Sequence, residues 1–171
     1  MTYSQQPVAP VGARTRSPLQ IGSLAVGAVF LVVGVLGFVP GITTDFDTLT
    51  FAGHHTDAKL LGLFQVSVLH NIVHLLFGVA GVLAARTAVA SRSFLIGGGV
   101  VYLALWLYGL VIDHDSAANF VPVNTADNWL HLGLGAGMVA LGLVLPRMVR
   151  NGPGGPAGTR SAPGTHSAHG Y

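Results

Sequence analysis

The sequence is poor in charge. Of its 171 residues only 8% are Asp, Glu, Lys or Arg, whereas 51% are hydrophobic. A soluble globular domain typically carries about 25% charged residues, which cover its surface in water. The small charged fraction therefore excludes an ordinary water-soluble domain and predicts that most of the outer surface faces lipid.

Two residue types with strong chemistry are missing. The chain has no cysteine, which excludes disulfides, thiolate metal sites, iron–sulfur clusters and a cysteine nucleophile. It also has no glutamate and no aspartate at membrane depth, so acid–base catalysis by paired carboxylates has no candidates. No GxSxG, Walker A, HExxH or GxGxxG pattern occurs. We therefore expect no enzyme and no catalytic residue.

A basic surface stripe is absent as well. The isoelectric point of about 9.4 rests on eight Lys and Arg residues that are scattered along the chain. Nucleic-acid binders gather such residues on one face or helix. We therefore expect no nucleic-acid partner.

Long apolar segments are what the chain has instead. About 20 helical residues cross a hydrocarbon layer of ~30 Å. The sequence predicts an all-α fold with four transmembrane helices in an antiparallel bundle, preceded and followed by disordered tails at residues 1–18 and 151–171. The four helices are expected within a membrane domain of residues 19–150, at about 19–39, 60–85, 93–112 and 128–145.

The charges are divided between the two sides of such a bundle. With four crossings, seven of the eight basic residues fall on one side, while Lys59 and all six Asp residues fall on the other. Cytoplasmic loops carry an excess of Lys and Arg in membrane proteins. We therefore expect a multi-pass protein of the plasma membrane with both termini in the cytoplasm.

Polar residues interrupt the second and fourth apolar segments. At helical spacing they form a stripe on each helix, continued by glycines such as Gly78 and Gly135. Buried polar groups need partners in lipid, and small residues allow helices to approach closely. We expect the two helices to share a polar seam or interior made of Ser67, His70, Asn71, His74, Asn128 and His131.

The histidines allow three more specific hypotheses. His70 and His74 are four residues apart and could hold one metal ion, with His131 or Asp127 as a further ligand. His70 and His131 could ligate a haem between neighbouring helices. A proton or ion path through the three histidines is the third possibility, although the inner halves of both helices contain no titratable residue.

Weak internal repetition accompanies this pattern. Leu69-His70 lies 16 residues before Arg86 when counted from the histidine, and Leu130-His131 lies 16 residues before Arg147. If both arginines mark the inner membrane interface, His70 and His131 are equivalent and lie at one depth.

Two stretches carry a family resemblance. Gly62 to Gly81, with its HNIVHL motif, and Ala126 to Gly135, with ADNWLHLGLG, resemble the actinobacterial membrane proteins grouped as domain of unknown function 4383. The resemblance covers about residues 19–146. It implies a four-helix plasma-membrane protein, without an activity, substrate or cofactor. It also marks His70, Asn71, His74, Asn128 and His131 as motif positions.

The combined expectation is a small non-enzymatic scaffold or accessory subunit. It would lie in the lipid bilayer and associate with itself or with a larger membrane complex. The alternative is a haem-binding, metal-binding or ion-conducting protein that uses His70, His74 and His131.

Overall fold

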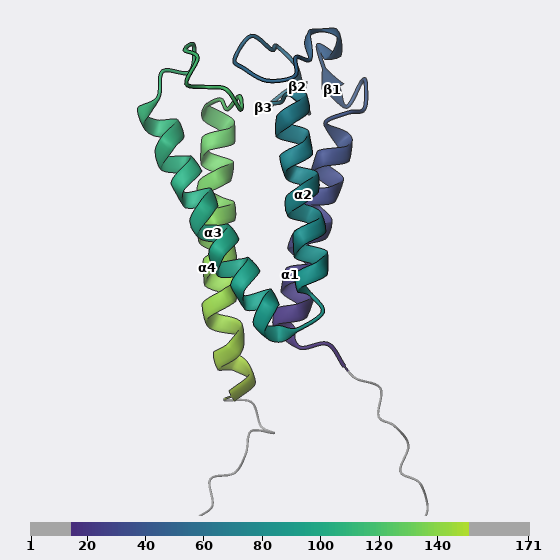
Figure 1. Ribbon diagram of the computed structural model, residues 1–171, viewed down its shortest axis with the longest axis vertical. Helices are drawn as coiled ribbons and strands as arrows, with labels where there is room; N and C mark the ends of the chain where they lie inside the picture. The colour runs from purple at the N-terminus through teal and green to yellow at the C-terminus, as the bar shows by residue number, and fades with distance from the viewer. Residues whose placement is uncertain (1–14, 151–171) are drawn as a thin grey trace, which may run out of the picture.

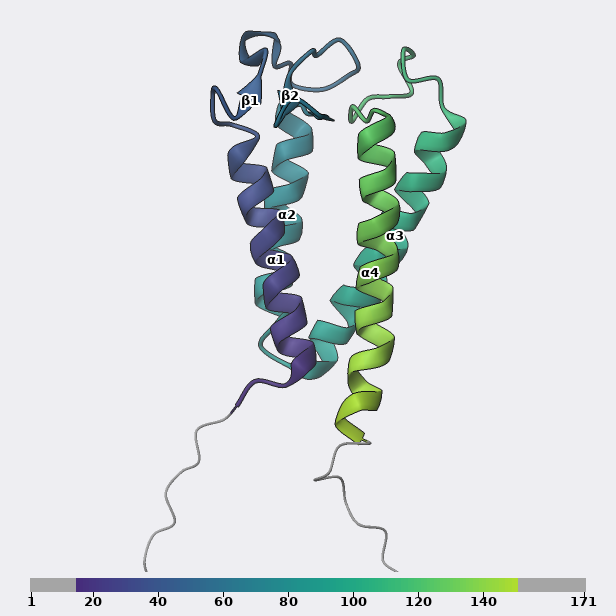
Figure 2. The same cartoon turned by 180° about the vertical axis from the view of Figure 1, so that it is seen from behind.

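The computed structural model describes residues 15–150. The predictions for most of the first tail and all of the second, residues 1–14 and 151–171, lie outside this range. Within it, four helices alternate in direction: α1 (Pro18–Leu36), α2 (Val68–Ala84), α3 (Ala88–Val111) and α4 (Thr125–Arg150). Both ends of the described chain lie at the same end of the molecule, and the two long connections lie at the other (Figures 1 and 2). The four helices of the predicted all-α fold are confirmed, and the structure is mostly helical.

Three of the helices, α1, α3 and α4, are long and apolar enough to cross a membrane. The remaining helix, α2, has 17 residues and is shorter than these three. Its outer face is nevertheless as apolar as those of its neighbours. Large exposed hydrophobic side chains lie on all four helices, among them Val29, Val32, Leu76, Val79, Val100, Leu107 and Leu143. Lipid is the medium that such a surface matches.

The start of α2 differs from the prediction. The apolar run from Leu60 was expected to be helical, but the chain there forms a small antiparallel sheet in the order β1 (Thr43–Thr44), β2 (Lys59–Leu60), β3 (Phe64–Gln65). Leu61 and Gly62 turn the chain with φ of 55° and 70°. Helix α2 begins only after Ser67, whose side chain accepts a hydrogen bond from the His70 backbone. A short apolar run does not by itself distinguish a strand from a helix.

The helices associate as two pairs, because α1 packs along α2 and α3 packs along α4. The pairs are joined by the short α2–α3 connection and diverge towards the opposite end (Figure 1). A buried cluster holds the pairs together, with Phe30, Leu95, Tyr102 and Met138 at its centre.

Glycines set the distance within each pair. A Cβ added to Gly27 of α1 would lie 2.9 Å from the Gly78 carbonyl oxygen of α2, and one added to Gly99 of α3 would lie 2.8 Å from the Gly135 carbonyl oxygen of α4. The backbones are therefore in direct contact. The glycine stripes of α2 and α4 were expected to face a common seam, but they face α1 and α3, because close backbone packing occurs inside each pair.

The two pairs repeat the same contacts. Gly27, Phe30 and Leu31 of α1 and Gly37, which caps this helix, correspond to Gly99, Tyr102, Leu103 and Gly109 of α3, each 72 positions later. Asn71, His74 and Gly78 of α2 correspond to Asn128, His131 and Gly135 of α4, each 57 positions later. In the first pair, the side-chain amide of Asn71 occupies the place where a Cβ on Gly37 would be. In the second pair, the amide of Asn128 occupies the place where a Cβ on Gly109 would be. The two halves thus have the same orientation: α1 and α3 run in one direction and α2 and α4 return in the other, as in a parallel repeat.

This register corrects the one read from the sequence. His131 was matched with His70 through the distance to the following arginine. The contacts instead match His131 with His74, and His70 with Asp127. The arginine spacing misleads because the repeat is defined by interhelical packing, and the ends of the helices are not part of that packing.

The glycine contacts predict an asymmetric response to adding one methyl group. Gly99→Ala should lower the free energy of unfolding by about 1–3 kcal/mol, because its Cβ would overlap Gly135 and Val139. Gly97 lies on the same helix with nothing within 4 Å of an added Cβ. Gly97→Ala should therefore be neutral or stabilise by up to about 1 kcal/mol. Denaturant titration of the detergent-solubilised protein, followed by circular dichroism, measures both; equal effects would contradict the packing.

Candidate functional site

A column of aromatic rings marks the place where the two helix pairs meet. Phe30 of α1 stacks on Tyr102 of α3, with ring centroids 5.3 Å apart. Each ring also meets the histidine of its own half edge to face: Phe30 and His74 at 5.5 Å, and Tyr102 and His131 at 5.2 Å. Phe30 is the repeat equivalent of Tyr102, and His74 is that of His131. The rings therefore surround the pseudo-two-fold axis that relates the two halves.

Three histidines gather beside these rings. His70, His74 and His131 are 6%, 6% and 4% exposed. The Nε2 atoms of His70 and His74 lie 3.1 Å apart, and Nδ1 of His70 lies 3.1 Å from the Pro122 carbonyl oxygen. The rings of His70 and His131 are 6.4 Å apart. The structure therefore brings together all three histidines that the sequence singled out.

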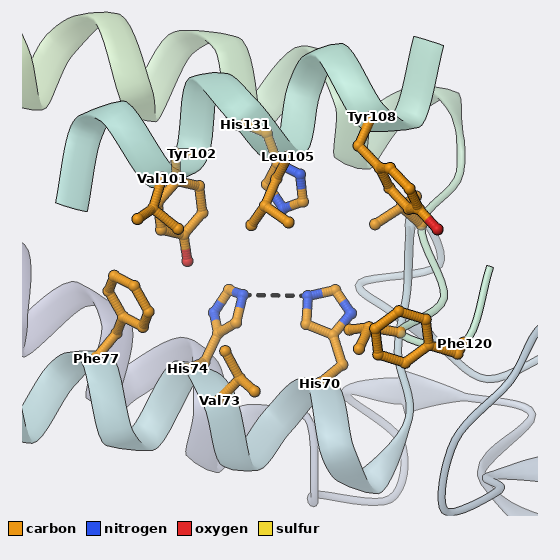
Figure 3. Close-up of a pocket in the computed structure, with 12 residues that line it drawn as sticks. His70, Val73, His74, Phe77, Val101, Tyr102, Leu105, Tyr108, Phe120 and His131 are labelled. Atoms are coloured by element: carbon orange, nitrogen blue, oxygen red, sulfur yellow. Dashed lines mark hydrogen bonds between the residues drawn. The ribbon is translucent and has the colours of Figure 1, made fainter. Parts of the chain in front are cut away.

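A cavity of about 280 Å³ opens in front of the histidines. Figure 3 shows His70 and His74 projecting from α2 towards Tyr102 and Leu105 of α3. The ring of His131 lies next to Leu105, on the same side of the cavity as Tyr102. Most of the lining is apolar or aromatic, and Val123 closes it from the α3–α4 connection. A largely apolar pocket with a few converging polar groups is typical of a small-molecule site.

A second, smaller cavity of about 90 Å³ lies on the other side of the histidines. Its lining includes Val33, Leu130 and His131, which are the repeat equivalents of Leu105, Val73 and His74 in the larger cavity. The same three histidines border both spaces. The two cavities are therefore pseudo-symmetric counterparts of unequal volume.

Two imidazole nitrogens at this site have no hydrogen-bond partner among the described residues. Nδ1 of His74 and Nδ1 of His131 are buried without a hydrogen bond within residues 15–150. A buried polar atom that makes no hydrogen bond costs about 1–3 kcal/mol. Such atoms call for an explanation, and a ligand in the adjoining cavity provides one.

The remaining predicted seam residues have structural positions. Ser67 caps α2. Asn71 and Asn128 place their side chains against Gly37 and Gly109, within their own helix pairs. These amides thus contribute to the helix pairing, whereas the histidines face the space between the pairs.

Asp127 joins the two halves at their outer ends. Its Oδ2 accepts hydrogen bonds from the backbone N–H of Gln65 in β3 at 3.0 Å and from that of Asn124 at 2.9 Å. Asn124 in turn accepts one from the Asp127 backbone, which forms a reciprocal cap at the start of α4. The buried Asp127 carboxylate therefore already has backbone N–H groups as its hydrogen-bond donors.

Metal and haem binding place specific demands on these side chains. No group of three His, Cys, Asp or Glu side chains in the described part of the chain is arranged to hold one metal ion. Both ring nitrogens of His70 already face hydrogen-bonding atoms, so ligating a haem iron would require its contact with His74 or Pro122 to break. Both hypotheses stay predictions.

Two site residues were not identified from the sequence. Neither Phe30 nor Tyr102 is among the candidate residues singled out in the sequence. The signal was nevertheless present: a glycine followed by an aromatic residue three positions later and a glycine ten positions later occurs at Gly27 and again at Gly99. Reading this pattern with the N-x-x-H-x-x-x-G motif of the second and fourth helices would have found both rings.

The position of Asp127 predicts the effect of removing its carboxylate. Asp127→Ala should lower the free energy of unfolding by about 1–3 kcal/mol for each backbone N–H that loses its acceptor. Asp57 is exposed on the same side of the molecule, and Asp57→Ala should have little effect. Thermal unfolding in detergent compares them; an unaltered midpoint for Asp127→Ala would show that this link is not needed.

Comparison with known proteins gives one match. A family model described as a domain of unknown function, number 4383, matches residues 20–144. No curated protein and no solved structure is significantly similar to the chain. The matched range contains all of the contacts and cavities described above, and the chain therefore belongs to the family domain of unknown function 4383.

Proposed function

We propose that this membrane protein is a non-enzymatic accessory subunit that binds a small, lipid-soluble molecule in its larger cavity. The observation that carries the proposal is the combination of a 280 Å³, mainly apolar space with buried, unpaired nitrogens on His74 and His131. An apolar ligand body would fill the space, and a polar group would bind the histidines.

A purely structural role for the histidines explains less. Hydrogen bonding between helices accounts for the contacts of His70 with His74 and Pro122. It does not account for the buried Nδ1 atoms of His74 and His131, which find no partner within residues 15–150 although their side chains border the cavity. The ligand-binding role accounts for both.

Conduction of protons or ions is also less well supported. The buried cluster around Phe30, Leu95 and Met138 is apolar, and it occupies the space between the helix pairs. A proton path requires a chain of titratable groups or water beyond the histidines. We therefore place the ligand, and not a transport path, at this site.

The proposed setting is the plasma membrane, with the histidines towards its outer face. Arg16 precedes α1, Arg86 lies in the α2–α3 connection and Arg92 lies near the start of α3, whereas Asp47 and Asp113 lie in the α1–α2 and α3–α4 connections. Figure 1 shows the α2–α3 connection at the end where the described chain begins and ends, and the other two connections at the opposite end. The excess of positive charge favours the first end as cytoplasmic. A second copy or a larger membrane complex would be the partner of such an accessory subunit.

The absence of cysteine makes this orientation directly testable. Ala117→Cys, in the exposed α3–α4 connection, should react with a membrane-impermeant maleimide on intact cells. Val89→Cys, which is exposed at the other end of α3, should react only after the cells are permeabilised. The opposite labelling pattern would reverse the proposed orientation.

The proposed ligand site predicts a difference between two neighbouring positions. Val73 lines the larger cavity, whereas Ile72 lies on the exposed face of the same helix. Val73→Trp should fill the cavity and abolish small-molecule adducts in native mass spectra of the protein purified from its membrane. Ile72→Trp should retain them, and adducts that persist in both variants, or occur in neither variant nor the parent, would contradict a ligand in this cavity.

A further inference from the structure

Resting on the proposed function, we infer that the ligand of the larger cavity carries a hydroxyl group, which donates a hydrogen bond to Nδ1 of His74. The inference comes from the order of hydrogen bonds at the site. It specifies a ligand chemistry that an apolar cavity alone would not require.

The chain of contacts starts at Pro122. A carbonyl oxygen only accepts hydrogen bonds, so Nδ1 of His70, 3.1 Å away, must carry the proton. In a neutral imidazole the other nitrogen is then an acceptor. Nε2 of His70 therefore accepts from Nε2 of His74, at 3.1 Å. This leaves Nδ1 of His74 without a proton, as an acceptor.

Both rings are taken as neutral because their surroundings disfavour charge. A buried imidazolium needs an acidic partner or water. No acidic side chain forms a hydrogen bond or ion pair with His70 or His74 within residues 15–150, and the Asp127 carboxylate accepts from two backbone N–H groups. A neutral, acceptor-bearing His74 is the form that this environment stabilises.

An acceptor without a donor selects its ligand. Within the described part of the chain, Nδ1 of His74 is buried and unpaired, and the His74 side chain lines the larger cavity. A hydroxyl would satisfy it, whereas an ether, ketone or hydrocarbon has no proton to donate. His131, whose tautomer is not set by a hydrogen bond, can accept from or donate to a second polar atom of the same ligand.

The walls indicate the body that carries the hydroxyl. Four rings line the cavity, from Phe77, Tyr102, Tyr108 and Phe120. Val101 and Leu105, on the side between α2 and α3, are 44% and 41% exposed, so this side adjoins the lipid. An aromatic or similarly apolar alcohol that dissolves in the bilayer fits both observations.

The test uses 1-naphthol and 1-methoxynaphthalene as probes. They share the ring system, but only naphthol has a proton to donate. The full chain is placed in lipid nanodiscs, and retention of each probe is measured by equilibrium dialysis against empty nanodiscs, which corrects for partition into lipid. Naphthol should bind about tenfold more tightly than its methyl ether, and Val73→Trp should abolish binding of both.

A matched variant assigns the preference to the nitrogen. The double variant with His70→Phe and His74→Phe keeps a ring at each position. It removes the His74 acceptor together with Nε2 of His70, which the loss of His74 alone would leave as a new acceptor in the cavity. This double variant should reduce the preference for naphthol to about twofold or less. Equal affinities in the parent protein, or a full preference in the double variant, would overturn the inference and leave the cavity as a ligand site. If neither probe is retained in a way that Val73→Trp removes, the proposed function fails as well.

A spectroscopic measurement avoids dependence on folding of the variant. In protein labelled with ¹⁵N-histidine, the scalar coupling across the Nε2–H···Nε2 hydrogen bond identifies His70 and His74. Nδ1 of His74 should be unprotonated, and its resonance should shift with naphthol but not with the ether. A protonated Nδ1 on His74 would overturn the inference.

Discussion

Direct backbone contact through glycine is the constraint on which this structure depends. Gly27 against Gly78, and Gly99 against Gly135, bring two helices together without side chains between them. In lipid, where the hydrophobic effect does not drive helices together, such packing is a main source of association. The pairing fixes the rotation of each helix, and the rotation directs His74 and His131 into the space between the pairs, where each ring packs on the aromatic ring of its own pair.

Hydropathy was sufficient to predict the number and direction of the helices, because the apolar runs are separated by polar connections, of which the first and third contain Asp and the second carries Arg86. It also marked the site, since His70, His74 and His131 stand out within apolar segments. It failed between Leu60 and Ser67, where the same apolar character belongs to strands and the helix starts later. Leu61 adopts a positive φ there, a conformation that composition does not reveal.

Two features were not predicted correctly from the sequence, for different reasons: the register of the repeat and the cavity. The register was encoded in the spacing of Gly27, Phe30 and Gly37 and its copy from Gly99, but the arginines were a more obvious guide and a misleading one. The cavity depends on which side chains fill the space between the pairs. Leu105 and Val33 are equivalent in position, yet they border volumes of about 280 and 90 Å³. Hydropathy treats these two residues alike.

Having both halves in one chain has a consequence for how the site can vary. In a dimer of identical subunits every substitution appears twice, so both cavities would change together. Here the position occupied by His70 in one half is Asp127 in the other; the His70 side chain borders the larger cavity, whereas the Asp127 carboxylate binds the backbone of β3 and of Asn124. Because both halves belong to one chain, each can change without the other, so a substitution that enlarges one cavity need not weaken the contact that holds the two halves together.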